Sequence, residues 1–351
     1  MSVTGKVKLQ GGLSGNLGDA DRPGIEQTPG SAGQHPVFRR ELAADGTFTP
    51  QDNLFTVPFG YGPGEHRPEA GRYRLLWMKA CPYAHRAVIV RRLLGLEEAI
   101  SLGTASHFRT EHGWEFSLDE GGVDPVLGIR YIKEIYDAED PAWPGRPTVP
   151  IVVDVQTGRG VNSDYFRLTN YLETVWAPFH KEGAPDLYPE GLREEIDALN
   201  AVIFTDINSG VYKAGFAHSQ GAYERAYHTL FARLDWLEER LTGSRYLFGD
   251  AITDSDVRLY TTLVRFDAAY YPVFNTNRNR LVDFPNLWSY ARDLYQIPGF
   301  GDTTDLAAIR SSYHASPHLR GFARNPFGIR PKGQDEAIWL TPHGREKWSK
   351  G

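Results

Sequence analysis

A single cysteine, Cys81, stands between a short apolar run and a segment with helical spacing. Residues 72–78 are RYRLLWM, a run typical of a buried strand, and residues 82–95 are PYAHRAVIVRRLLG, which predicts a helix ending at Gly95. Pro82 suits the first position of a helix, because the N–H that it lacks would be unpaired there anyway. The sequence therefore predicts a strand, then a cysteine that caps a helix, then that helix.

This position makes the Cys81 sulfur a candidate nucleophile. Free N–H groups of the first helical turn and the positive end of the helix dipole favour a thiolate, so we expect the thiol pKa to be lowered from about 8.5. His85 and Arg86, one turn later, could add positive charge. With one cysteine, the chain can form no internal disulfide and has no CxxC site. The alternative interpretation is a small, buried and unreactive side chain.

A second feature lies 68 positions after Cys81, where Val149-Pro150 begins another apolar run. TVPIVVD and TGRGVN predict two short strands joined at a glycine turn, and residues 163–176 regain helical spacing, with Ser163 or Asp164 placed to cap the helix. A strand, a capping cysteine, a helix and then a Val-Pro strand are typical of a thioredoxin-like site, where the Val-Pro bond is usually cis. Residues 104–146, in between, show little regular patterning and predict an insertion that could serve binding.

Beyond Leu187 the pattern is helical almost throughout. In YERAYHTLFARLDWLEERLTG, a stripe of apolar residues falls on one face and Gly243 ends the helix. Thr253 and Asp256 have the spacing of a capping box, which predicts that another helix begins there. The fold class that follows is an α/β thioredoxin-like N-terminal domain followed by an all-α C-terminal domain.

We expect four segments along the chain: an irregular N-terminal arm at 1–70, a thioredoxin-like thiol-binding domain at 71–180, an all-helical domain at 187–331 and a C-terminal tail at 332–351. The arm is rich in glycine, proline and polar residues, which is typical of turns and coil. Two apolar islands in it, HPVFRR and DNLFTV, could pin the arm to a neighbouring surface.

Composition excludes several classes of partner. The formal net charge of -6 gives no general attraction to nucleic acid or to an anionic membrane. No apolar run approaches the roughly 18 residues that cross a bilayer, and the first residues lack the pattern of a secretory signal, so we expect a cytoplasmic protein. No metal site is expected, because Pro317 interrupts any helix between His314 and His318.

Six blocks of the sequence, in order, resemble the glutathionyl-hydroquinone reductases, the Xi class of the glutathione-transferase superfamily. The likeness extends from Gly71 to Pro331. The blocks are ACPYAHR at Cys81, GW at Trp114, GRPTVP at 145–150, INSGVYKAGFA around Tyr212, RYLFGDAITDSDVRLYTTLVRFDAAYY, and DFPNLWSYARDLYQIPG.

This resemblance implies a reductase in which the Cys81 thiolate attacks the sulfur of a glutathionyl-hydroquinone and forms a mixed disulfide, which a second thiol then releases. It implies Tyr212 as the proton donor or acceptor, and Tyr270 and Tyr313 as hydrogen-bond donors that lower the cysteine pKa. It further implies glutathione as cosubstrate, no bound cofactor, an aromatic hydroquinone conjugate as the other substrate, and a homodimer. The implied thiol-binding residues are Trp114, Arg146, Pro147, Thr148, Val149, Asp164 and Tyr165.

The chain departs from the family pattern at several positions. Tyr83 stands where the family has Trp, and Asp164-Tyr165 stands where it has Glu-Ser, at the end of the pocket that holds the γ-glutamyl group. A different small thiol, such as mycothiol, is therefore an alternative. Two other functions stay open: a general thioltransferase or dehydroascorbate-type reductase that uses Cys81 on disulfides, and a non-catalytic binding module.

Overall fold

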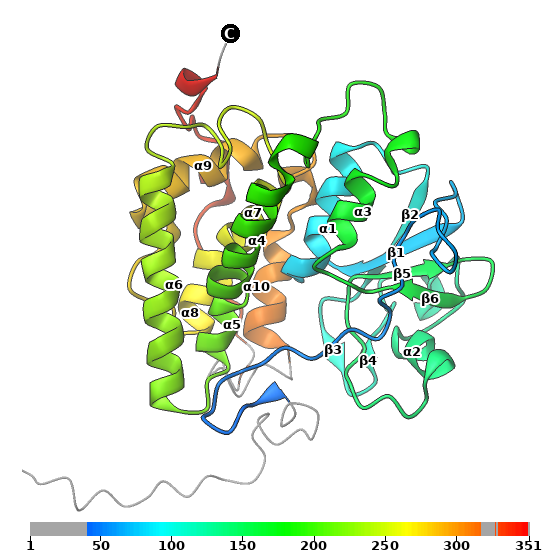
Figure 1. Cartoon of the computed structure of the whole chain (residues 1–351). Helices are drawn as coiled ribbons and strands as arrows, with labels where there is room; N and C mark the ends of the chain where they lie inside the picture. Colours follow the sequence, from blue (N-terminus) through cyan, green and yellow to red (C-terminus); the bar gives the residue numbers. More distant parts are fainter. Residues whose placement is uncertain (1–40, 317–326, 328, 350–351) are drawn as a thin grey trace, which may run out of the picture. The chain divides into compact units, whose positions relative to one another are not determined.

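A four-stranded mixed sheet forms the centre of the α/β part, in the order β2-β1-β5-β6 (Figure 1). The computed structural model describes residues 41–316, 327 and 329–349, all within the unit Ala32–Gly351. β1 pairs in parallel with β2 and antiparallel with β5, and β5 pairs antiparallel with β6. All residues of β1 and β5 are buried, so these two strands form the core, as predicted. The strands are β1 (Tyr73–Met78), β2 (Ile100–Ala105), β5 (Ile151–Asp154) and β6 (Arg159–Asn162).

Three helices accompany this sheet. α1 (Pro82–Leu93) and α3 (Leu168–Glu173) pack side by side, and Figure 1 shows α2 (Lys133–Glu139) on the other side of the strands, where it contacts β6. α1 begins at Pro82, as predicted. The arrangement has the strand and helix order of a thioredoxin-like fold.

The prediction of little regular structure at 104–146 was wrong in part. This segment contains a two-stranded ladder of β3 (Arg109–Thr110) and β4 (Gly113–Trp114), and then helix α2. Strands of two residues cannot show an alternating pattern, and α2 buries few of its residues, so neither element produces a periodic signal.

The rest of the chain is helical, as predicted. α7 lies at the centre of this part with every residue buried, and α6 packs by a single apolar stripe that includes Leu230, Leu234 and Leu237. Thr253 and Asp256 form the predicted capping box at the start of α7. The helices are α4 (Arg193–Ile203), α5 (Gly210–Gly215), α6 (Gln220–Arg240), α7 (Asp254–Arg265), α8 (Tyr271–Val273), α9 (Pro285–Tyr295) and α10 (Leu306–Ala315).

Two π-helical turns interrupt this helical part. The first, Phe204–Asn208, lies between α4 and α5, and the second, Phe266–Tyr270, lies between α7 and α8. Such wide turns are frequent near functional sites, because they redirect the side chains that follow. Here they precede or include two of the tyrosines that the resemblance singles out, Tyr212 and Tyr270.

The described part of the arm packs against the edge of the sheet. Phe55 is only 6% exposed, and its carbonyl oxygen accepts a hydrogen bond from the Ser163 N–H at 2.8 Å. The Asn162 side chain donates to the Val57 carbonyl at 2.9 Å. The DNLFTV island therefore pins the arm, as expected, whereas HPVFRR lies outside the described residues.

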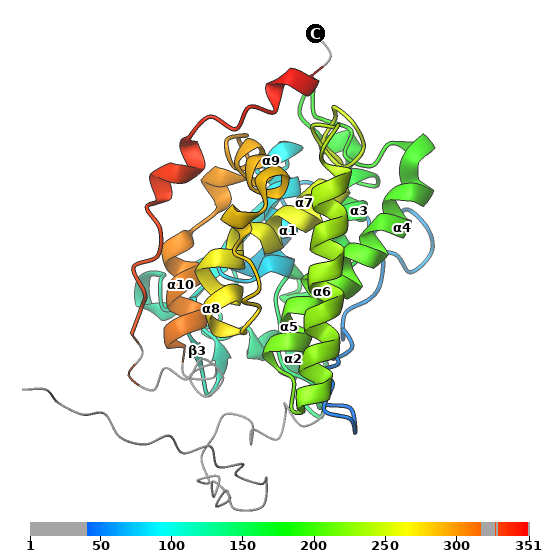
Figure 2. The ribbon, with the colours of Figure 1, turned by 90° about the vertical axis from the view of Figure 1, so that its left-hand side faces the viewer.

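The C-terminal segment runs along the outside of the helices (Figure 2). Trp339 is buried there against Trp288 of α9 and Tyr295, with ring centroids 4.8 and 5.1 Å apart. None of the helices in the described residues combines the length and the apolar character that crossing a membrane requires.

Candidate active site

Cys81 is the N-cap residue of α1, as predicted. Its Sγ accepts a hydrogen bond from the Ala84 N–H at 3.5 Å and lies 3.5 Å from the Val149 carbonyl oxygen, to which the thiol can donate. The bond between Val149 and Pro150 is cis, which confirms the thioredoxin-like expectation. The sulfur thus lies between the start of α1 and the backbone segment that leads into β5.

The structure corrects the expected pKa of Cys81. Burial of the sulfur raises the thiol pKa above its usual value, and this outweighs the opposing effects of the Ala84 N–H and the Arg265 charge. The sequence indicates the effect of the helix terminus on the pKa, but it does not show how deeply the sulfur is buried. Desolvation disfavours the charged form of a buried thiol. In the free protein, Cys81 is therefore held mainly as a thiol at neutral pH.

His85 does not act as the sequence suggested, whereas the positive charge of Arg86 does act to lower the pKa of Cys81, against the larger effect of burial. His85 is fully buried, and burial lowers its pKa well below the usual value, so the imidazole is neutral. Its Nε2 lies 2.9 Å from the Thr303 hydroxyl. The Arg86 guanidinium donates to the Asn208 side chain at 2.5 Å and lies over the Tyr83 ring. Both side chains therefore connect α1 to other elements.

Arg265, at the end of α7, holds the backbone that precedes Cys81. Its Nε donates to the Ala80 carbonyl at 2.9 Å, and one Nη donates to the Lys79 carbonyl at 3.0 Å. The other Nη donates to the carbonyl of Thr261 within α7. A residue of the helical part thus fixes the cysteine loop of the α/β part.

Three tyrosine hydroxyls from the helical part form one cluster. The Tyr212 and Tyr313 oxygens are 2.5 Å apart, and the Tyr270 oxygen lies 3.3 Å from Tyr313 and 3.5 Å from Tyr212. Burial raises the pKa of each phenol, so all three are neutral at physiological pH. Neutral phenols can donate protons or hydrogen bonds. In this structure, each of these hydroxyls bonds within the cluster.

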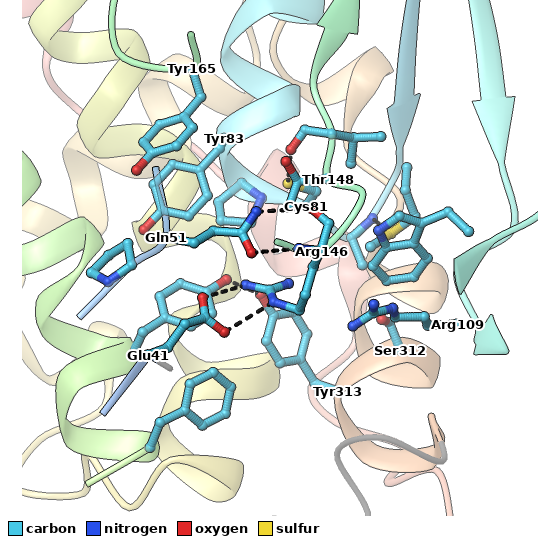
Figure 3. Close-up of a pocket in the computed structure, with 18 of the residues that line it drawn as sticks. Glu41, Gln51, Cys81, Tyr83, Arg109, Arg146, Thr148, Tyr165, Ser312 and Tyr313 are labelled. Atoms are coloured by element: carbon cyan, nitrogen blue, oxygen red, sulfur yellow. Dashed lines mark hydrogen bonds and ion pairs between the residues drawn. The ribbon is translucent and has the colours of Figure 1, made fainter. Parts of the chain in front are cut away.

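A cavity brings most of the predicted site residues together (Figure 3). Tyr270 is buried behind Tyr212 and Tyr313 and does not line the cavity. Pro147 and Asp164 do not line it either. The Asp164 carboxylate accepts from the N–H groups of Phe166 and Arg167 in the turn before α3, whose N-cap is Arg167, so the predicted helix cap at Ser163 or Asp164 was wrong. The predicted residues that line the cavity are Cys81, Trp114, Arg146, Thr148, Val149, Tyr165, Tyr212 and Tyr313.

Two of the departures from the family pattern contact each other. The rings of Tyr83 and Tyr165 lie with centroids 5.0 Å apart, and both line the cavity near Cys81. The Tyr83 hydroxyl donates to the Asn208 carbonyl at 3.2 Å. Tyr165 therefore narrows this end of the pocket, while Tyr83 fills the wall behind it.

Sequence reasoning missed the contribution of the arm. The Glu41 carboxylate forms two hydrogen-bonded contacts with the Arg146 guanidinium, at 2.7 and 3.0 Å, and Glu41 is only 2% exposed. The Gln51 side chain accepts from the Arg146 N–H and donates to the Arg146 carbonyl, both at 2.8 Å. These partners lie about a hundred positions before Arg146, and nothing in the coil-like arm marks them.

Arg109 was missed as well. It lies in β3, and its side chain reaches the cavity beside Ser312 (Figure 3). The sequence of its segment shows little regular patterning, so no pattern indicates which of its residues face inward. Among the described residues, no group of three or more histidine, cysteine or acidic side chains could hold a metal ion.

Comparison with known proteins supports the resemblance. Residues 220–293 match the family model "Glutathione S-transferase, C-terminal domain". The chain is 41% identical over 276 residues to the glutathionyl-hydroquinone reductase PcpF of Sphingobium chlorophenolicum, a match that covers 78% of this chain and 86% of the relative.

Solved structures of glutathione transferases also resemble this chain. A glutathione transferase from Gordonia bronchialis superposes with a TM-score of 0.78 at 50% identity, over 81% of this chain and 87% of its own. YqjG of Escherichia coli, solved with glutathione bound, gives a TM-score of 0.74 at 37% identity, over 87% of this chain and 94% of its own. The chain therefore belongs to the glutathionyl-hydroquinone reductase family, the Xi class of the glutathione transferases.

Proposed function

We propose that this protein removes the thiol from S-glutathionyl-hydroquinones, with Cys81 as nucleophile and Tyr212 as proton donor. The observation that carries the proposal is one cavity lined by the only cysteine of the chain and by the neutral Tyr212–Tyr313 pair. A sulfur nucleophile and a proton donor are the two groups that reductive cleavage of an aryl thioether requires.

In the first step, the Cys81 thiolate attacks the sulfur that joins glutathione to the aromatic ring. The carbon–sulfur bond breaks, a sulfur–sulfur bond forms, and the ring carbon takes a proton from the Tyr212 hydroxyl. The adjacent Tyr313 hydroxyl, 2.5 Å away, supports the phenolate that forms. The products are the hydroquinone and a mixed disulfide between Cys81 and glutathione.

In the second step, the thiolate of another glutathione attacks the glutathione sulfur of that mixed disulfide. Glutathione disulfide leaves, and the Cys81 thiolate is regenerated. Two thiols supply the two electrons that reduce the carbon–sulfur bond. This scheme uses one protein cysteine, in agreement with the cysteine count.

The thiol would bind along the backbone at Val149, just before β5. A peptide thiol can pair with the Val149 backbone as an added strand does, which places its sulfur beside Cys81. Glutathione bound to YqjG supports glutathione as the cosubstrate here. By family resemblance, we further propose a cytoplasmic homodimer with Cys81 as its catalytic cysteine.

The test is thiol-dependent release of hydroquinone from an S-glutathionyl-hydroquinone. We expect turnover by the wild type and none by Cys81→Ala. Tyr212→Phe should slow the release of hydroquinone and leave the reduction of a preformed Cys81–glutathione disulfide unchanged, because only the first step needs the proton. Tyr61→Phe, on an exposed tyrosine, is the matched control and should behave as the wild type.

Other results would point elsewhere. Activity on mixed disulfides with none on the aryl thioether would identify a general thioltransferase. Turnover of a mycothiol conjugate in preference to the glutathione conjugate would assign mycothiol as the thiol. Absence of both activities would leave a binding module.

A further inference from the structure

Two guanidinium groups face the cavity, and they differ in how their charge is balanced. Arg146 has Glu41 as a buried carboxylate partner, with both oxygens engaged. Gln51 holds the backbone of Arg146 in place. This guanidinium is already matched by a carboxylate of the chain itself, so another anion could bind it only in competition with Glu41.

Arg109 has no such partner. In the part of the chain that the structure describes, its Nε is buried without a hydrogen bond, and no carboxylate forms an ion pair with it. Its backbone N–H, by contrast, donates to the Ser316 hydroxyl. Burial, together with the nearby charge of Arg146, lowers the pKa of Arg109 to about 10, and the charge of Glu41 opposes this only in part. Glu41 is the ion-pair partner of Arg146, so an anion in the cavity would give the guanidinium of Arg109 a direct partner and would stabilise it.

The position of Arg109 indicates which anion. In the β3–β4 ladder, Arg109 is the direct partner of Trp114, and both residues line the cavity. The charge of Arg146 also acts on Arg109, so the two guanidinium groups are close together. Arg146 stands three positions before Val149, whose backbone would hold the cysteinyl part of a peptide thiol. Tyr83 and Tyr165 occupy the side of the cavity away from Arg109 in Figure 3. Arg109 therefore lies at the end of the cavity that Trp114 and Arg146 line, where one end of the bound peptide thiol is expected.

We propose that Arg109 is a specificity-determining residue that binds the terminal carboxylate of the peptide thiol, while Arg146 serves mainly to dock Glu41 of the arm. This inference rests on the proposed function. A guanidinium can hold a carboxylate through two parallel hydrogen bonds, which gives both affinity and orientation. The site would thus select a thiol whose end near β3 carries a carboxylate.

The experiment measures binding by calorimetry, so it does not depend on turnover. S-methylglutathione, which cannot form a disulfide, is titrated into the wild type, Arg109→Gln and Arg109→Lys, and each titration is repeated with its glycyl ethyl ester. Arg109→Gln should weaken binding of the acid by roughly 10- to 100-fold, because a hydrogen bond to a charged group contributes about 1.5–3 kcal/mol. Binding of the ester should be equal in Arg109→Gln and the wild type, and Arg109→Lys should recover part of the loss.

A second variant separates the two arginines. Glu41→Gln would remove the carboxylate that pairs with Arg146. If Arg146 bound the carboxylate of the thiol, this change would tighten the binding of S-methylglutathione to the Arg109→Gln variant. We expect no such gain. If the wild type and Arg109→Gln bind S-methylglutathione equally tightly, the inference about Arg109 is wrong and the proposed function is untouched. If the wild type binds neither S-methylglutathione nor its ester, the proposed function is wrong as well.

The carboxylate could instead belong to the aromatic substrate. Glutathionyl-hydroquinones with and without a ring carboxylate distinguish the two sources. If Arg109→Gln raises the KM only for the ring-carboxylated conjugate and leaves the binding of S-methylglutathione unchanged, the thiol assignment is wrong. The expected result is that the KM for both conjugates rises by the same factor.

Discussion

At the scale of single residues, two opposing influences meet at the Cys81 sulfur. The Ala84 N–H and the charge of Arg265 favour the thiolate, while desolvation favours the thiol, and desolvation is the larger influence in the free protein. The three tyrosine hydroxyls that could stabilise a thiolate bond to one another instead. Activation of the sulfur would then require that substrate rearrange the hydrogen bonds of this cluster.

The pH dependence of alkylation follows from this balance. Because the pKa of Cys81 is raised, the rate of reaction with iodoacetamide should still be increasing with pH above about 8.5, the value of an ordinary thiol. The same chain unfolded in urea is the control, since its one cysteine then has an ordinary pKa. A midpoint lower in the folded than in the unfolded protein would contradict the prediction.

Local patterns predicted part of this site. The prediction of Cys81 as a helix cap depends on neighbours within a few positions, and the structure confirms it, whereas the cap predicted at Asp164 is wrong because α3 begins later, with Arg167 as its N-cap. The raised pKa of Cys81 and the pairing of Arg146 with Glu41 depend on residues far away in the sequence, and no local pattern contains them. The roles of the three tyrosines came from the family resemblance and stay predictions.

At the scale of elements, the packing of α1 against α7 joins the two parts of the site. Arg265 at the end of α7 is fully buried and bonds to the carbonyls of Lys79 and Ala80, immediately before Cys81. The cysteine loop is therefore positioned by a helix that follows it by about 180 residues in the chain.

Replacing Arg265 tests that connection. Arg265→Met would leave two carbonyl groups unpaired, each at a cost of about 1–3 kcal/mol, so the free energy of unfolding in urea should fall by roughly 2–6 kcal/mol. The Cys81 alkylation midpoint should also move to higher pH, because a charge that favours the thiolate is lost. Arg159→Met, on an exposed ion pair, should change stability by less than about 1 kcal/mol. Equal effects of the two changes would show that Arg265 does not hold the loop.

Elements differ in how well the sequence predicts them. The α6 stripe and the Thr253 capping box repeat known local spacings, and both are confirmed. The β3–β4 ladder is held mainly by contacts to the rest of the fold, since each strand has two residues. Its Arg109 could not be recognised as a cavity residue without the surrounding structure.

At the scale of the whole molecule, the cavity is built from three stretches of chain: the arm, the α/β part and the helices. Glu41 and Gln51 come from the arm, and the arm is held at the sheet edge by Phe55. The Phe55 ring lies directly over Gly160 of β6, where a Cβ would come within 2.7 Å of two ring atoms. The close approach of this ring therefore requires glycine at position 160.

Gly160→Ala should loosen the arm without unfolding the helices. The alanine methyl would displace the Phe55 ring, so amide hydrogen exchange in peptides covering residues 41–60 should become faster. Gly191→Ala is the control, since no atom lies within 4 Å of the added methyl. Unchanged exchange in Gly160→Ala would show that the arm is held by other contacts.

The separation of Cys81 from Tyr313 also has a consequence during biosynthesis. The helix that carries Tyr313 leaves the ribosome some 230 residues after the cysteine does, which corresponds to roughly ten seconds to a minute at typical rates of translation. Throughout that interval the nascent chain carries the thiol without the completed pocket. The newly made sulfur can therefore be oxidised or modified before it can turn over substrate.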